Sequence, residues 1–291
     1  MYLKLFARYN DNLREGVKSM LNRVICGDCT EVLYRLEESC VHMILTDFPA
    51  DFENTEFTKK TRGKPLNGWR GADRNITKDI YDKYSEIAKA FFRVTKPGAS
   101  VIVYAGRRYA HRMICAMEDS GFTYKDMICW SRDSVSHRAQ RLDVLYTKRG
   151  DEGNAKSWEG WRVGNLRPSY ESIYWFVKPY RIGGTLADNI IENGVGGYNN
   201  TAWEEYSPLA ENSIHVDYEK QDKGLHPEQK PINLAKALIE LVTLPGQTVL
   251  DPFCGSGTTL CAAKKLGRNF IGIDISSEYC NIATNRLDIK Q

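Results

Sequence analysis

The segment that most constrains the fold lies near the C-terminal end of the chain and reads VLDPFCGSGTT, followed by FIGIDIS. A short apolar strand is expected to run into a glycine-bearing turn, and a helix is expected to begin at the threonines. The next apolar strand ends on Asp274, which is 274 − 255 = 19 residues after Gly255. A strand, turn, helix and strand in this order are typical of a parallel α/β unit.

The same turn has the features of a nucleoside-binding site. Gly255 and Gly257 let the backbone approach a ligand closely, and the N–H groups at a helix start favour an anionic group such as a carboxylate. An acid about 20 residues further on is placed to accept hydrogen bonds from ribose hydroxyls. A turn that only packs a helix against a strand is the alternative. Asp251 before the turn and Asp274 after it favour the nucleoside site.

Alternating strand and helix patterns occupy two long regions of the chain, separated by a polar and irregular stretch. The expected strands are 23–26, 41–46, 248–251 and 269–274, with others inside SVIVYAG, TYKDMICW and PSYESIYWFV. The expected helices are 30–36, 232–242, 258–266 and 278–287, with two more inside DKYSEIAKAFFRV and YAHRMICAMEDS. Thr30 and Glu31 are expected to cap the first helix, and a Pro-Gly turn is expected before SVIVYAG. Residues 178–224 have turn residues throughout and little periodicity.

Seven segments follow one another in a fixed order: GDC, ILTDFP, VTKPGASVIVYAG, LRPSYESIYWFVKP, HPEQKP, LDPFCGSGTT and GRNFIGIDIS. In these segments the chain resembles the β-group of S-adenosylmethionine-dependent DNA amino-methyltransferases, which act on adenine N6 or cytosine N4. The resemblance covers most of the chain. It implies a Rossmann-like class I methyltransferase fold, α/β and circularly permuted, with a mostly parallel twisted sheet and helices on both faces. The 291 residues are then expected to form a single domain.

The resemblance implies a site for S-adenosylmethionine. Asp28 would bond the adenine, Asp274 would hold the ribose, and Lys230 and Pro231 would approach the methionine part. The residues implied to line the cofactor are Asp28, Cys29, Asp47, Lys230, Pro231, Asp251, Phe253, Cys254, Gly255, Ser256, Gly257, Thr258, Asp274 and Ile275. No metal site is expected, because the C-x-x-C spacing of Cys26 and Cys29 has no second pair at metal-ligand spacing.

The catalytic residues are implied to be Asp47, Phe48 and Pro49, together with Phe52. The family motif is usually Asp-Pro-Pro followed by an aromatic residue. Here Phe48 replaces the first proline and Ala50 the aromatic residue, which normally stacks on the flipped base. Ala50 at this position has three possible explanations. Phe52 or Phe48 takes over the stacking, the enzyme acts on an altered base, or the protein is a cofactor- and DNA-binding homologue with little activity.

A net charge of +3 says little about nucleic acid, but the basic residues form local clusters. A solvated face is the alternative to phosphate contact, which is favoured because the first cluster directly follows the catalytic turn. The residues expected to bind DNA are Lys59, Lys60, Arg62, Lys64, Arg70, Arg74, Arg138 and Arg141. The segments expected to face DNA are 51–80, the basic insertion 131–165 and the candidate target-recognition insertion 180–225.

These features together predict methyl transfer to adenine N6 in DNA after base flipping. Asp at position 47 favours adenine over cytosine N4, which is the second choice, and RNA or protein methylation is a third. A homodimer, a cognate restriction nuclease and a phage context are further expectations. The chain shows no secretory leader and no apolar run of about 18 residues, so a cytoplasmic location and no membrane contact are expected.

Overall fold

The structure is a computed structural model of the whole chain. It describes residues 19–48, 74–106, 109–133, 139–164, 166–180, 183–220, 224–225 and 229–288, with only the backbone described at 74–79 and 288. Within these ranges, none of the helices combines the length and the apolar content that crossing a bilayer requires.

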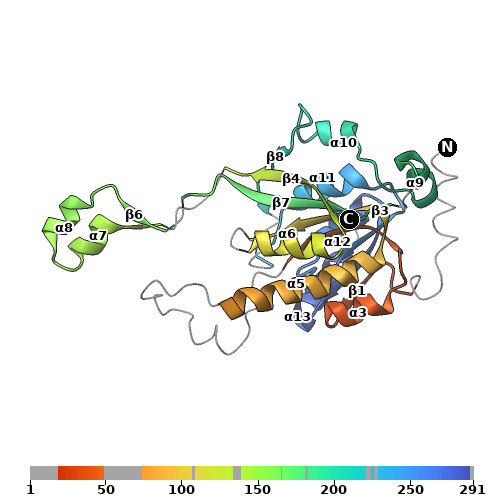
Figure 1. Cartoon of the computed structure of the whole chain (residues 1–291), viewed down its shortest axis with the longest axis horizontal. Coiled ribbons are helices and arrows are strands. Elements are labelled where there is room, and N and C mark those ends of the chain that lie inside the picture. The colour runs from red at the N-terminus through yellow and green to blue at the C-terminus, as the bar shows by residue number, and fades with distance from the viewer. Residues whose placement is uncertain are drawn as a thin grey trace.

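An eight-stranded sheet forms the centre of the described structure (Figure 1). In spatial order its strands are β1 (Arg23–Cys26), β10 (Asn269–Asp274), β9 (Thr248–Asp251), β2 (Val41–Asp47), β3 (Thr95–Tyr104), β7 (Tyr170–Val177), β4 (Thr123–Ser131) and β8 (Ser213–His215). Strand β7 runs antiparallel to β3 and β4, whereas the other paired neighbours are parallel. The mostly parallel sheet that the sequence predicts is confirmed.

Helices cover both faces of this sheet. They are α3 (Cys29–Arg35), α5 (Arg74–Val94) and α6 (Ala110–Asp119) on one face, and α11 (Ile232–Val242), α12 (Thr258–Lys265) and α13 (Ser277–Asp288) on the other. Strand β2 shows why two cores form: Ile44 packs in the first cluster, whereas Met43 and Leu45 pack in the second. Successive side chains of a strand point to opposite faces, so a strand buried on both sides is apolar throughout.

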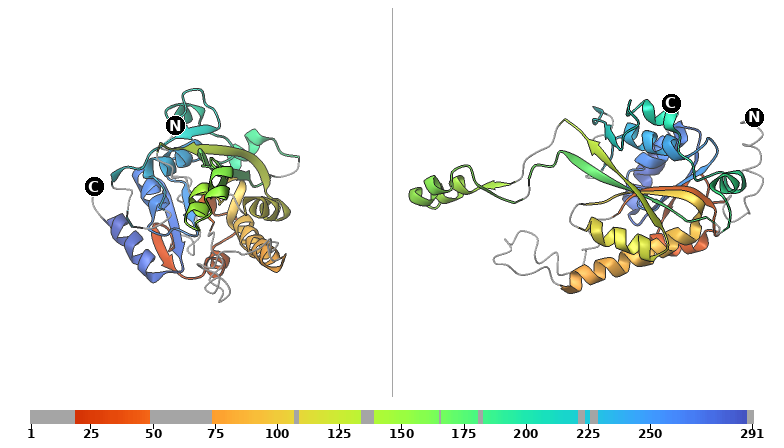
Figure 2. Two further views of the ribbon diagram at one scale, coloured as in Figure 1. Left: turned by 90° about the vertical axis from the view of Figure 1, so that its left-hand side faces the viewer. Right: turned by 45° about the horizontal axis from the view of Figure 1, so that its top comes forward.

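A small unit projects from the sheet and lies well away from it (Figures 1 and 2). Its elements are β5 (Gln140–Arg141), α7 (Leu142–Thr147), α8 (Glu152–Ser157) and β6 (Arg162–Val163). The segment 178–224, expected to be irregular, instead contains α9 (Leu186–Asn193), α10 (Asn200–Glu204) and strand β8. A capping box at Thr185 and Asp188 starts α9, and this is a local signal that does not depend on a long apolar period.

Two local predictions are wrong. The cap of α3 is Asp28, whose side chain accepts hydrogen bonds from the backbone of Thr30 and Glu31. The Pro-Gly turn lies inside β3, where the pairing with β2 shifts between Val41 and Met43. Gly98 has φ +83°, and a Cβ there would meet the side-chain amide of Asn189 on α9 at 2.1 Å. The Pro-Gly pair therefore lies in an irregular part of β3, and α9 packs against this strand.

Candidate active site

Three carboxylates lie at the ends of neighbouring strands along one edge of the sheet. Asp47 ends β2, Asp251 ends β9 and Asp274 ends β10. The strands are parallel, so their carboxyl ends share an edge, and this is where open α/β sheets bind ligands. The sequence predicted all three positions, and the fold brings them to one region.

Asp47 forms an ion pair that the sequence did not predict. The ammonium of Lys230 lies 2.7 Å from Oδ2 of Asp47, with side-chain exposures of 12% for Lys230 and 33% for Asp47. The ammonium also lies 5.4 Å from the centre of the Tyr104 ring, in the position of a cation–π contact. Burial opposes the charged form of Lys230, but the charge and hydrogen bond of Asp47 outweigh it, and the pKa of Lys230 is raised. Lys230 therefore remains an ammonium at neutral pH.

Asp251 has a different environment from Asp47. It is 4% exposed, and its Oδ1 accepts hydrogen bonds from the Thr46 hydroxyl at 2.7 Å and from the Phe253 N–H at 3.2 Å. Burial raises the pKa of this carboxyl to about 6, and the hydrogen bonds from Thr259 and Thr46 oppose the shift. The resemblance implies that Asp251 lines the cofactor site. In this structure its hydrogen bonds link the end of β2 to the turn after β9.

The glycine-bearing turn is held from two sides. Gly257 has φ +81° and caps α12, and a Cβ added to it would lie 2.9 Å from the Cβ of Ala283 on α13. Arg286, also on α13, donates a hydrogen bond of 2.6 Å to the carbonyl of Ser256. On the other side the Gly255 N–H donates to Oδ2 of Asp274 at 2.8 Å. The turn is thus held by contacts within the protein.

Asp274 and Asp28 are the carboxylates predicted to contact the adenosine. The Oδ1 of Asp274 accepts from the Ser276 N–H at 2.8 Å, so each oxygen takes one backbone hydrogen bond and retains capacity for another. Asp28 caps α3 through Oδ1, and the Thr30 side-chain hydrogen bond is the main reason that its pKa is lowered. Beside Asp274, Ile275 is 76% exposed and presents an apolar surface.

The remaining residues of the predicted cofactor site are mostly buried. Cys29 begins α3 and is 8% exposed, and burial raises the pKa of its thiol to about 12. Pro231 is the N-cap of α11. In the turn the buried residues are Cys254, Gly255, Ser256, Gly257 and Thr258, whereas Phe253 is half-buried.

One residue that the sequence did not single out supports the fit of the cofactor. Gln229 directly precedes Lys230 and is 7% exposed, and neither its amide nitrogen nor its amide oxygen has a hydrogen-bond partner among the described residues. A buried primary amide without partners is costly, so a ligand with both donors and acceptors is a suitable complement. The amino-acid part of S-adenosylmethionine has this chemistry.

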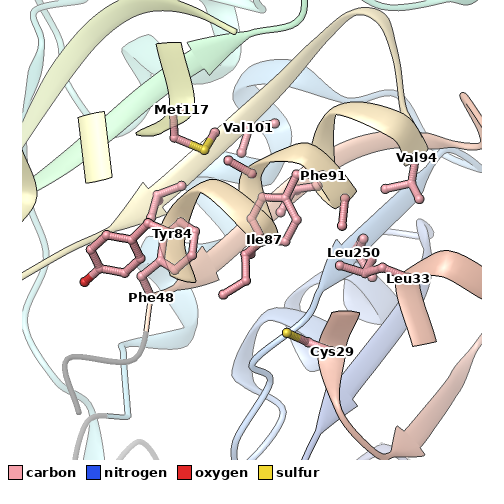
Figure 3. Packing of buried hydrophobic residues seen from close by; sticks show 14 of the residues in the cluster. Cys29, Leu33, Phe48, Tyr84, Ile87, Phe91, Val94, Val101, Met117 and Leu250 are labelled. Atoms are coloured by element: carbon pink, nitrogen blue, oxygen red, sulfur yellow. The ribbon is translucent and has the colours of Figure 1, made fainter. Parts of the chain in front are cut away.

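The ring of Phe48 lies in the hydrophobic core beside Tyr84 (Figure 3). Phe48 is 2% exposed and packs against Tyr84, Phe91 and Phe253 at ring-centre distances of 5.0, 5.6 and 5.8 Å. A ring in the core cannot stack on a base, so the prediction that Phe48 stacks is wrong for this structure. Pro49, Ala50 and Phe52 lie outside the described residues.

Most of the predicted DNA-binding residues also lie outside the described ranges: Lys59, Lys60, Arg62, Lys64, Arg70 and Arg138. Arg74 begins α5, and its side chain is not described. Arg141 belongs to the projecting unit, where its Nε donates to Asp143 at 3.1 Å, and its side chain is 54% exposed. The structure therefore gives the charge of Arg141 a partner within the protein.

Comparison with known proteins identifies the family. A family model for DNA methylases matches residues 41–285. The type II methyltransferase M.HindIII of Haemophilus influenzae is 42% identical, over 94% of this chain and 97% of that protein. The type II methyltransferase M.HpaI of Haemophilus parainfluenzae is 28% identical, over 92% of this chain and 75% of that protein.

Two solved structures share the fold. The M1.HpyAVI–SAM complex matches with a TM-score of 0.59 and 23% identity, covering 92% of this chain and 99% of that chain. The cytosine-N4-specific PvuII DNA methyltransferase matches with a TM-score of 0.61 and 17% identity, covering 90% of this chain and 85% of that chain. At these identities the likeness concerns the fold alone.

Proposed function

Because this chain belongs to the S-adenosylmethionine-dependent DNA amino-methyltransferases, which modify adenine N6 or cytosine N4, we propose that it methylates adenine N6 in DNA. The observation that carries the proposal is the ion pair of Asp47 and Lys230 at the carboxyl end of a central strand. It places an oriented carboxylate at the sheet edge that also carries the glycine-bearing turn and Asp274.

The exocyclic amino nitrogen of a base is a poor nucleophile, because its lone pair is delocalised into the ring. Acceptors aimed at its N–H bonds stabilise the positive charge that develops as the nitrogen attacks. Asp47 is the proposed carboxylate acceptor. Lys230 donates to its Oδ2 at 2.7 Å and so orients the carboxylate. The backbone carbonyl of Phe48 is the proposed second acceptor, and it acts independently of the side chain.

The packing of Phe48 makes this assignment physically reasonable. Its N–H donates to the carbonyl of Tyr104 at 3.1 Å, and its ring is fixed in the core, so the backbone that follows Asp47 starts from a rigid point. Rigid placement provides the orientation that an enzyme needs to bring reacting atoms together. When bound, S-adenosylmethionine supplies the electrophilic methyl group.

The flipped base needs an aromatic surface, because leaving the duplex stack costs a few kcal/mol. With Phe48 in the core, Phe52 is the proposed stacking residue. Stacking contributes about 1–3 kcal/mol per base, so Phe52→Ala should slow transfer by roughly 5- to 150-fold. An unchanged rate would leave an altered substrate base or weak catalysis as the explanation of Ala50.

Cytosine N4 is the second candidate, because the same pair of acceptors suits its amino group. Asp47 as the first residue of the motif is the feature that favours adenine. The relatives M.HindIII and M.HpaI are type II methyltransferases, which supports a site-specific action on DNA beside a cognate nuclease. The homodimer and the target-recognition role of residues 180–225 remain proposals.

The proposal is tested with a tritiated-methyl transfer assay on duplex DNA, single-stranded DNA and RNA, using the wild-type chain and Asp47→Ala. We expect transfer to DNA by the wild-type chain, and none by Asp47→Ala, whose affinity for S-adenosylmethionine should persist. Transfer to RNA alone, or full activity of Asp47→Ala, would contradict the proposal. Equal cofactor binding by the two proteins serves as the control for folding.

A further inference from the structure

A second group of polar side chains lies at the carboxyl ends of β4 and β8. It consists of Asp133, His215 and Asp217, and one ligand-type atom from each lies within 4.8 Å of the others. Strands β4 and β8 are parallel, and β7 runs antiparallel to both β3 and β4, so these ends lie at the same edge of the sheet as Asp47. Neither the cofactor site nor the proposed methyl transfer uses these side chains.

The orientation of His215 determines which ring nitrogen faces the carboxylates. Its Nδ1 lies 3.1 Å from Oγ of Ser131, and that hydroxyl lies 3.4 Å from the carbonyl of Ile214. A serine hydroxyl can accept a hydrogen bond from Nδ1–H, so the contact is compatible with the tautomer that carries its proton on Nδ1. The lone pair of Nε2 is then directed at Asp133 and Asp217. Metal-binding histidines are commonly oriented in this way, through a hydrogen bond from the other ring nitrogen.

The distances fit a shared cation better than direct hydrogen bonds. Nε2 of His215 lies 3.6 Å from Oδ1 of Asp133 and 3.5 Å from Oδ2 of Asp217. Direct N–H···O bonds are shorter, with a usual range of about 2.7–3.2 Å. Two ligands bonded at about 2.1 Å to a tetrahedral zinc ion are roughly 3.4 Å apart. The two separations from His215 are close to that value, and the two carboxylate oxygens lie within 4.8 Å of each other.

The carboxylates are also held in place. Oδ1 of Asp217 accepts a hydrogen bond of 3.0 Å from the N–H of Asp133, which leaves Oδ2 directed at His215. His215 and Asp217 are two residues apart, so they project from the same side of an extended chain. The side chains of Asp133, His215 and Asp217 are 85%, 52% and 51% exposed, so a metal ion and a water ligand can reach them.

We propose that Asp133, His215 and Asp217 bind one zinc ion or a similar divalent transition-metal ion, with water completing a tetrahedral site. The ion would join the carboxyl ends of β4 and β8. It would also neutralise two carboxylates at the edge proposed to face DNA. This last consequence rests on the proposed function, whereas the metal site itself does not.

The test is a zinc titration of the full, thiol-reduced chain at pH 7.5 against a chromogenic chelator. Thiols can also bind zinc and the chain has eight cysteines, so the informative quantity is the difference between variants. We expect the wild-type chain to bind one more ion than His215→Ala or the near-isosteric Asp217→Asn. Ser131→Ala should bind that ion about 10- to 100-fold more weakly, because His215 loses its orientation. His111→Ala, which removes an exposed histidine on α6, should match the wild type.

Cobalt provides a second readout that does not depend on activity. The difference spectrum between the wild-type chain and His215→Ala should show bands of a nitrogen- and oxygen-coordinated ion, without the intense near-ultraviolet band of thiolate ligands. Equal metal stoichiometry in the wild type, His215→Ala and Asp217→Asn would overturn the proposal, and so would a difference spectrum dominated by thiolate. Either result would leave the methyl-transfer proposal untouched, because that proposal is measured separately.

Discussion

The ammonium of Lys230 lies 2.7 Å from Oδ2 of Asp47. Lys230 directly precedes the N-cap of α11 and Asp47 ends β2, so the ion pair links the start of this helix to the carboxyl end of the strand. The two residues are 183 positions apart in the sequence. The resemblance to the family assigned Lys230 to the methionine part of the cofactor, whereas the structure pairs it with the proposed catalytic acid. Orienting Asp47 would affect kcat, whereas holding the cofactor would affect the affinity for S-adenosylmethionine.

Replacing Lys230 with Gln separates the two roles. If Lys230 orients Asp47, kcat should fall by about 100-fold, because a small displacement of a catalytic group has an effect of that size. The affinity for S-adenosylmethionine should change little. The measurement is methyl-transfer kinetics together with calorimetric cofactor binding, and Lys89→Gln, which changes an exposed lysine of α5, is the matched control. A large loss of cofactor affinity with kcat unchanged would favour the cofactor role instead.

The raised pKa of Asp251 predicts that the free energy of unfolding depends on pH. Its pKa is raised to about 6 in the folded protein, from an ordinary value of 3.8. Between these values the unfolded chain binds fewer protons than the folded chain, so the free energy of unfolding falls as the pH rises. The stabilising contribution of the Asp251 carboxyl to the free energy of unfolding is present below about pH 4 and is lost above about pH 6. Its size is roughly 3 kcal/mol at most.

Asp251→Asn removes this titration while keeping an oxygen for the hydrogen bonds from Thr46 and Phe253. Urea unfolding of both proteins from pH 4 to pH 8 measures the effect. Relative to the variant, the wild type should lose stability between pH 4 and pH 6 and then remain constant. A difference that is the same at every pH would show that Asp251 titrates normally.

Phe48 should matter for stability through its ring and for catalysis only through its backbone. Phe48→Ala leaves a cavity among Tyr84, Phe91 and Phe253 and should reduce the free energy of unfolding by about 3–5 kcal/mol. Phe48→Leu fills most of that space and should keep a near-normal transfer rate at a temperature where it is folded. A Leu variant that is fully folded but inactive would show that the ring itself takes part in the reaction.

The basic residues that follow the proposed catalytic turn should make DNA binding dependent on salt. Phosphate contacts release counterions, and each contact contributes about 0.9 to the slope of log affinity against log salt concentration. Changing Lys59, Lys60, Arg62 and Lys64 to Ala should therefore flatten the slope measured by fluorescence anisotropy. Arg141→Ala should have a smaller effect per residue, because Arg141 already pairs with Asp143. An unchanged slope in the fourfold variant would assign these residues to a solvated face.

The regular elements of the sheet were largely predictable from the sequence. Helix α11 and strands β9 and β10 have the bounds that the apolar patterns indicated, because buried parallel strands and amphipathic helices leave strong local signals. The three acids at the strand ends followed from the same patterns. Helix α9 was not predicted, because it is short and most of its side chains are exposed.

The interactions that define the site were harder to predict. The bond of Lys230 to Asp47 and the cluster of His215 with Asp133 depend on which distant segments the fold brings together. No local period encodes such contacts. The burial of Phe48 also depends on tertiary packing, since a phenylalanine after a strand-ending acid can point inward or toward a ligand. The sequence thus indicated the residue types of the site, and the structure supplied their partners.

The proposed product of the reaction is adenine methylated on N6 in DNA. The most direct measurement is mass spectrometry of the nucleosides from DNA treated with the purified protein and S-adenosylmethionine, beside DNA treated with Asp47→Ala. We predict N6-methyldeoxyadenosine in the first sample and its absence from the second. N4-methyldeoxycytidine as the product, or no methylated nucleoside at all, would contradict the claim.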